Sequence, residues 1–193
     1  LKIQIFSLYD VITTALHSFI EQADVKGIEV TTHVDDSARM CGDPIRLGVV
    51  LRHLIDNALK FTEQVFESSV NGIIIVDEQL RFMRVNEAFT KMTGYSPEEL
   101  IGQTPRILSS GLQDRKFYTQ MWEILKEKGT WQGELWNKRK GSELYAEMLS
   151  INAVRDKDGR VSNYIGIVTD ITEKKKAHER NEHLANYDYL TGL

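Results

Sequence analysis

The side chains that most often carry chemistry, histidine and cysteine, are unevenly distributed along this chain of 193 residues. Cys41 is the single cysteine, and neither residue type occurs from Val65 to Thr172. Haem iron usually needs an axial histidine and a cysteinyl-flavin needs a reactive thiol, so neither is expected in this segment. Asp156 and Asp158 lie in the stretch DKDG, which is typical of a turn and does not predict a metal site. Two possibilities remain for this segment: it binds an organic ligand non-covalently, or its pocket holds no ligand.

Composition and charge exclude further classes of protein. The chain is 41% hydrophobic and 27% charged, which is ordinary for a globular protein. Its net charge of −4 and its pI near 5.8 argue against binding to nucleic acid. A single cysteine allows no intramolecular disulfide, which favours a reducing cytoplasm. No apolar run approaches the roughly 18 residues that a membrane span needs. The chain opens with LKIQIF and no initiating Met, so we expect a part of a longer protein.

Alternating and β-branched residues predict an antiparallel meander of three strands in the second half of the chain. The strands are expected over 131–140, 143–155 and 161–169, with turns at RKGS and DKDG. The basic residues at 138–140 are interpreted as a solvated hairpin tip. Trp131 and Trp136 are five residues apart, so they should lie on opposite faces of the sheet. One of them should therefore contact a second copy of the chain or a flanking helix, and we predict a homodimer.

The segment before the meander predicts two further strands and several helices. Strands are expected over 73–76 and 81–85, joined by a polar turn. A helix over 87–92 should end near Gly94, and Ser96 followed by a proline should begin the next. A longer helix is predicted over 115–128, where apolar residues recur at helical spacing.

These segments carry a family resemblance. NGIIIVDEQLRFMRVNEAFTKMTGYSPEELIGQ, WNKRKGSELYAEMLSINAVRDKDG and GIVTDITEKK together resemble a PAS domain, the sensory module of many bacterial signalling proteins. The resemblance assigns residues 65–172 to this domain. It implies an α+β fold with a five-stranded antiparallel sheet and flanking helices, and a non-catalytic sensory function in signal transduction.

The stretch ILSSGLQDRKFYTQMWEILKEKGTWQGELWNKRKGSELYAE is similar to the FAD-binding PAS domains of redox regulators. That similarity implies an FAD cofactor whose isoalloxazine ring meets Trp122 and Asn137, with Tyr145 as a third candidate. An amide can serve the pyrimidine edge of a flavin as donor and acceptor, and an indole can donate and pack. The alternatives are that Trp122 belongs to the core and Asn137 to a hairpin. The segment 103–106 differs from flavin binders, which carry polar or acidic residues there, so a ligand-free dimerisation module stays open.

Residues 1–64 predict a separate segment with strands near 3–11 and 27–34 and a helix over 10–23. Asp43 and Pro44 should begin a second helix. Its expected core-facing stripe consists of Leu47, Val50, Leu51, Leu54, Ile55, Ala58 and Leu59.

This opening resembles the first part of the ATP-binding domain of sensor histidine kinases, a partial α/β fold. The resemblance places Asn57 at the Mg²⁺ ligand and Lys60 at a phosphate-facing position, while His53 departs from the usual asparagine. Neither an Asp-x-Gly-x-Gly box nor a glycine-rich lid follows. We therefore expect no working kinase here, and interpret the helix as amphipathic with its polar residues in water. A remnant ATP-binding segment is the alternative.

The end of the chain predicts a polar signalling helix over 173–187. The last six residues, DYLTGL at 188–193, resemble the start of GGDEF diguanylate cyclase domains. This resemblance implies that the sensor relays its state through the helix to a diguanylate cyclase.

Overall fold

The structure is a computed structural model, and it describes residues 3–25, 28 and 30–191, with side chains described up to 182. The chain divides into two compact units, Leu1–Glu67 and Ser68–Leu193, which are described separately. No helix in the described part is long and apolar enough to span a bilayer.

The first unit pairs two short strands next to two helices. Strand β1 (Gln4–Ser7) runs antiparallel to β2 (Arg39–Gly42), and α1 (Leu8–Val25) lies between them in sequence. The strand predicted over 27–34 is wrong: residues 28 and 30–34 lie in no strand, and 27 and 29 are outside the described residues. The segment that pairs with β1, over all four of its residues, is β2 and not the predicted one.

Helix α2 (Pro44–Ser68) begins as the sequence predicts, because the Asp43 carboxylate accepts the Ile45 and Arg46 backbone N–H groups at 3.1 and 3.2 Å. The helix continues past the domain boundary expected at residue 64. Of its predicted core stripe only Leu59 is buried, while Val50 and Leu54 are 53% and 60% exposed. The stripe is therefore only partly covered, as expected for a segment that lacks the remaining strands of a kinase domain.

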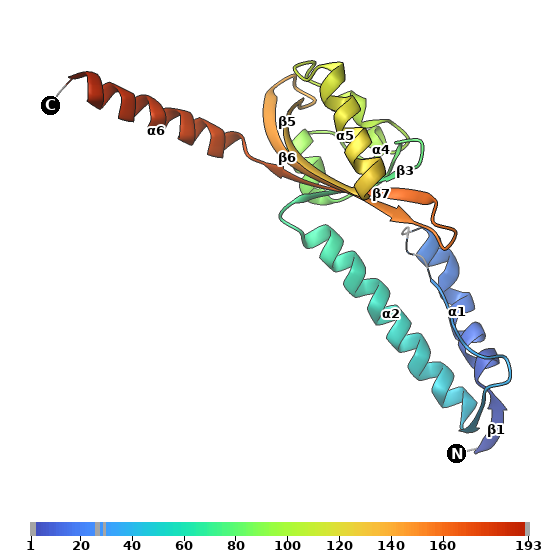
Figure 1. Ribbon diagram of the computed structural model, residues 1–193. Helices are drawn as coiled ribbons and strands as arrows, with labels where there is room; N and C mark the ends of the chain where they lie inside the picture. Colours follow the sequence, from blue (N-terminus) through green and yellow to red (C-terminus); the bar gives the residue numbers. More distant parts are fainter. Residues whose placement is uncertain (1–2, 26–27, 29, 192–193) are drawn as a thin grey trace. The chain divides into compact units, whose positions relative to one another are not determined.

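The second unit is built on a five-stranded antiparallel sheet in the order β4-β3-β7-β6-β5 (Figure 1). The strands are β3 (Gly72–Asp77), β4 (Phe82–Val85), β5 (Thr130–Lys138), β6 (Leu144–Arg155) and β7 (Val161–Asp170). This arrangement confirms the α+β fold and the meander. Two of the three expected turns form around aspartates: Asp77 accepts two backbone N–H groups, and Asp156 accepts those of Asp158 and Arg160.

Helices connect β4 to β5 and follow β7. They are α3 (Glu87–Thr93), α4 (Pro97–Leu100), the 3₁₀ helix η1 (Pro105–Leu108), α5 (Arg115–Lys128) and α6 (Thr172–Thr191). Side chains of Asn86 and Asp114 accept the backbone N–H of the third residue in α3 and α5. Both helices end at glycines, Gly94 and Gly129, in the left-handed conformation that glycine adopts without strain.

Helix α5 lies across one face of the sheet, called the inner face here (Figure 1). Trp131 on this face is buried and meets Phe117 of α5 edge to face at 5.9 Å between ring centroids. Trp136 is half-buried on the opposite face, as its odd separation from Trp131 predicts. Glu134, on the same face as Trp136, pairs with Lys175 of α6 at 2.6 Å, so the start of α6 lies against this outer face.

Candidate functional site

A cavity of about 660 Å³ lies between the inner face of the sheet and the segment η1–α5. Two buried apolar clusters contribute side chains to its wall, one around Phe82 and Phe89 and one around Met121 and Leu135. Gly166 of β7 leaves room in the wall, because a Cβ there would lie 2.7 Å from Ile74 Cγ1. A pocket of this size with mostly apolar walls is typical of small-molecule sites.

Two of the three residues expected at a flavin lie in the wall of this cavity. Trp122 reaches it from α5 and packs edge to face on Tyr164 of β7, with ring centroids 5.6 Å apart. Asn137 reaches it from β5 and is 8% exposed. Tyr145 does not line the cavity: it is wholly buried on β6 opposite Asn137, and the Arg139 guanidinium lies 4.6 Å above its ring.

Asn57, the candidate metal ligand, is exposed on α2 in the first unit. Lys60 of the same helix pairs with Asp56 at 2.6 Å, an arrangement typical of a solvated helix face. Within the described ranges, no three histidine, cysteine, aspartate or glutamate side chains lie close enough to hold a metal ion.

Sequence reasoning missed Glu147, the acidic residue in the cavity wall. It is 2% exposed on β6, and the Asn137 amide Nδ2 donates to its Oε1 at 3.0 Å. Its other oxygen, Oε2, and the Tyr145 hydroxyl have no hydrogen-bond partner of good geometry in the described structure. Burial raises the pKa of Glu147 to about 7, although the neighbouring Tyr145 hydroxyl and the Asn137 amide, which favour the ionised form, act in the opposite direction.

A signal for Glu147 was present in the sequence. Residues 145, 147, 149 and 151 share one face of β6 because strand side chains alternate, and the other three are Tyr, Leu and Ile. A carboxyl on an otherwise apolar strand face indicates a buried acid, which is rarely kept without a partner or a function.

The mouth of the cavity carries positive charge. Arg106 of η1 and Arg115 at the start of α5 line it and are exposed to solvent. The connecting segment is fixed to β5, because Ser109 forms an isolated β-bridge with Asn137 and Ser110 donates to the Trp136 carbonyl at 2.6 Å. The two arginines therefore lie on a segment that is held against the polar end of the cavity.

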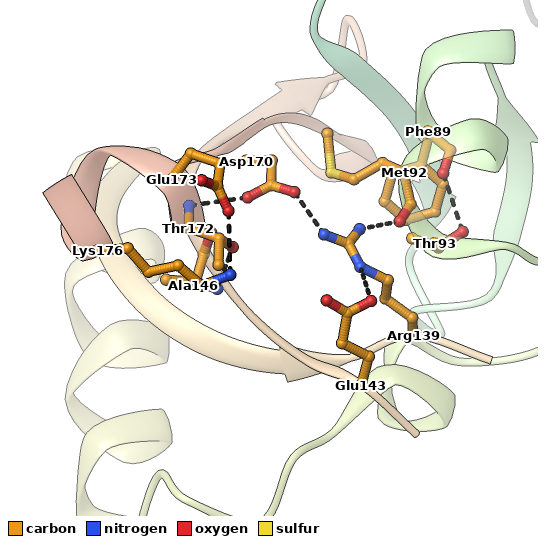
Figure 2. Close-up of polar contacts among 10 residues, drawn as sticks. All are labelled: Phe89, Met92, Thr93, Arg139, Glu143, Ala146, Asp170, Thr172, Glu173 and Lys176. Atoms are coloured by element: carbon orange, nitrogen blue, oxygen red, sulfur yellow. Dashed lines mark hydrogen bonds and ion pairs between the residues drawn. The ribbon is translucent and has the colours of Figure 1, made fainter. Parts of the chain in front are cut away.

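A second polar cluster connects the sheet to α6 (Figure 2). Arg139 pairs with Asp170 at 2.7 Å and with Glu143 at 3.2 Å, and it donates to the Met92 carbonyl. The prediction that the basic cluster at 138–140 is a solvated tip is wrong for Arg139, whose side chain is only 22% exposed. Its partner Asp170 lies on another strand, which the local sequence pattern does not reveal.

Asp170 also binds the first residue of α6. Its carboxylate accepts the Thr172 backbone N–H at 2.8 Å, and the Thr172 hydroxyl accepts the Ala146 N–H of β6 at 3.0 Å (Figure 2). Burial alone would raise the pKa of Asp170, but the hydrogen bonds from Thr172 and Arg139 lower it below its usual value. The carboxylate thus stays ionised and holds the beginning of α6 on the sheet.

The PAS domain family model matches residues 70–173, more than half of the chain. The protein therefore belongs to the PAS domain family. Its sheet and flanking helices resemble the crystal structure of a PAS domain of a protein from Colwellia psychrerythraea, with a TM-score of 0.57 and 22% identity over 60% of this chain and 98% of that one.

Among curated proteins, the chain is 32% identical over 120 residues to a nitrogen fixation regulatory protein of Klebsiella oxytoca, covering 62% of this chain and 24% of the relative. It is 29% identical over 144 residues to the cyclic di-GMP phosphodiesterase PdeR of Escherichia coli, covering 72% of this chain and 21% of that protein. The chain thus spans about a quarter of the length of these curated relatives.

Proposed function

We propose that this PAS sensory domain binds a flavin, in the form of FAD, non-covalently in the cavity of the second unit. The observation that carries the proposal is a mostly apolar cavity of about 660 Å³ with two buried polar side chains, Asn137 and Glu147, in its wall.

The residues present fit this cofactor. Trp122 and Tyr164 supply aromatic surface against which a planar ring can pack, and Asn137 supplies an amide for the polar edge of the ring. Arg106 and Arg115 at the mouth match the phosphates of a dinucleotide. A bound flavin would supply redox chemistry and visible absorbance, while the protein residues bind and orient it and exclude water.

The route from cavity to output helix runs along the sheet. Asn137 and Glu147 lie on β5 and β6, and the residue paired with Glu147 on β7 is Asp170. Asp170 in turn holds Arg139 and the Thr172 N–H at the start of α6. A change of charge or hydrogen bonding at the polar end of the cavity would therefore act on residues that fix α6. A coupling free energy of about 1–3 kcal/mol is typical between such sites.

The output we propose is cyclic di-GMP signalling through a GGDEF domain that follows α6 in the parent protein. The motif at 188–193 supports it, and its last two residues are outside the described residues. The printed name of the Escherichia coli relative, a cyclic di-GMP phosphodiesterase, is consistent with the same second messenger. We also propose that the chain forms a homodimer, as half-buried Trp136 on the outer face suggests. Size-exclusion chromatography with light scattering tests this, and a monomeric mass would refute it.

The visible absorption spectrum of the purified chain tests the flavin proposal. We expect a yellow protein that releases FAD on denaturation, or that gains colour when refolded with FAD. Asn137→Ala should lose the colour, whereas Asn152→Ala, an exposed asparagine on the same sheet, should keep it. A chain that stays colourless after refolding with FAD would refute flavin binding and favour a ligand-free PAS module.

A further inference from the structure

Helix α2 carries apolar residues on two adjacent sides, and only one of these sides is covered. The covered side holds the buried residues Gly48, Leu59 and Phe66. It lies against α1, because a Cβ at Gly48 would be 3.8 Å from Val11 Cγ1. The other side is in contact with solvent, and its four large side chains are 53–68% exposed: Val50, Leu54, Phe61 and Val65.

The uncovered side follows a heptad spacing. Steps of four and three residues alternate along six apolar positions, which are called the α2 seam here: Leu47, Leu51, Leu54, Ala58, Phe61 and Val65. This alternation averages 3.5 residues per turn, the period that keeps a stripe facing a partner helix in a left-handed coiled coil. At 1.5 Å per residue the seam is about 27 Å long. The spacing therefore favours another helix as the partner of this side.

The charged side chains of α2 lie away from the seam. Asp56 and Lys60, for example, form their ion pair at 2.6 Å on the opposite side of the helix. The positions that flank the seam carry no charge, and they are Gly48, Ile55 and Thr62 on one side and Val50, Asn57 and Gln64 on the other.

Uncharged flanks favour a second copy of the chain as the partner. In coiled coils the flanking positions often carry the charges that select a particular partner by complementary pairing. Two copies of one chain bring the same residue types together, and like charges there would repel. Flanks without charge avoid this repulsion, and they offer no complementary charge to an acidic or basic partner.

The exposed surface also suits a dimer. Leu54, Phe61 and Val65 of the seam and Val50 beside it each leave on the order of 100 Å² of apolar surface in water. Two copies would thus remove on the order of 800 Å² from water through these side chains alone. The flanking residues bring the total toward the roughly 1,200 Å² at which specific interfaces begin.

We propose that the α2 seam binds the α2 seam of a second copy of this chain, so that the two helices form a short coiled coil. This inference rests on the proposed homodimer and names α2, instead of the outer face around Trp136, as the surface that forms it. Asn57, exposed beside the seam, then faces the partner helix and not a metal ion.

Sedimentation equilibrium of the whole chain gives the dissociation constant of the dimer. Leu54→Glu and Phe61→Glu each remove apolar contact from both copies and place two carboxylates close together, so each should raise this constant at least a hundredfold. Val49→Glu is the matched control, since Val49 is 39% exposed on the side of α2 away from the seam, and it should leave the constant unchanged. Far-UV circular dichroism compares the helix content of the variants.

A second measurement tests the contact without introducing a charge. In a Cys41→Ser background, which has no other thiol, Leu54→Cys places one cysteine in the seam of each copy. Oxidation should join two copies through residue 54, because paired seam positions lie within reach of a disulfide. Val49→Cys in the same background should remain uncoupled on a non-reducing gel.

The outcomes separate this inference from the proposed homodimer. A wild-type chain that is monomeric at the highest concentration would overturn both. A dimer whose dissociation constant is unchanged in Leu54→Glu and Phe61→Glu, or that does not couple through residue 54, would overturn the α2 seam alone and leave the homodimer to the face around Trp136. If the glutamate variants fail to fold, the coupling through residue 54 decides.

Discussion

Replacing Glu147 by glutamine should change how the stability of the free protein depends on pH. The pKa of this carboxyl is 4.5 in an unperturbed chain and about 7 in the folded protein, because burial disfavours the charged form. The folded state therefore binds the proton more tightly than the unfolded state. Its contribution to stability is full below pH 4.5 and is lost as the pH rises to about 7, above which the loss is constant.

The size of the effect follows from this difference in pKa. The difference between a pKa of 4.5 and one of about 7 corresponds to about 3 kcal/mol of unfolding free energy, of which about 2–3 kcal/mol is lost between pH 5 and pH 8. Glu147→Gln has no proton to lose and should show no such decrease. Urea unfolding followed by tryptophan fluorescence at pH 5, 6, 7 and 8 gives both free energies, and their difference should change steadily over this range.

The same experiment with Glu127→Gln, exposed on α5, controls for the loss of one acidic residue from the surface. Its stability should run parallel to that of wild type across the whole range. If the difference between wild type and Glu147→Gln is the same at pH 5 and pH 8, Glu147 does not titrate in this window. Burial and the neighbouring Asp170 would then not raise the pKa of Glu147 as stated.

Two further predictions concern the cavity wall and the junction with α6. In Gly166→Val the new Cβ would lie only 2.7 Å from the Ile74 side chain, which should be forced toward the cavity and weaken FAD binding at least tenfold. An unchanged dissociation constant would disprove this effect. Gly141→Ala, at an open turn, is the control. Arg139→Met removes the ion pair to Asp170, so the free energy of unfolding should fall by about 1 kcal/mol and amide hydrogen exchange at the start of α6 should become faster. Unchanged amide exchange would show that this ion pair does not hold the helix.

The sequence predicts local structure best where chain neighbours decide it. Helix α5 has the bounds expected from its pattern, because Asp114 caps its start and Gly129 ends it. The five strands of the second unit follow from alternation and turn residues. The strand expected over 27–34 fails because pairing with β1 is decided by Arg39–Gly42, and alternation alone does not say which segment finds the partner.

The candidate site is predicted only in part for a related reason. The resemblance to flavin-binding domains led to Asn137 and Trp122, which line one cavity. It also led to Tyr145, which is packed behind that wall. Glu147 escapes a prediction based on histidine, cysteine and clustered carboxylates, because it is a single carboxyl on an apolar strand face. Arg139 was misjudged because its partner Asp170 is 31 residues away in sequence.

The choice of residue at position 147 separates a structural role from a functional one. An apolar side chain would avoid the cost of a buried charge but would leave the Asn137 Nδ2 group without its acceptor. Glutamine would keep that hydrogen bond and never ionise. Glutamate alone makes the number of donors at this end of the cavity depend on pH, and it does so at a loss of stability near neutrality. Of these three choices, glutamate is the one whose effect on the stability of the fold depends on pH.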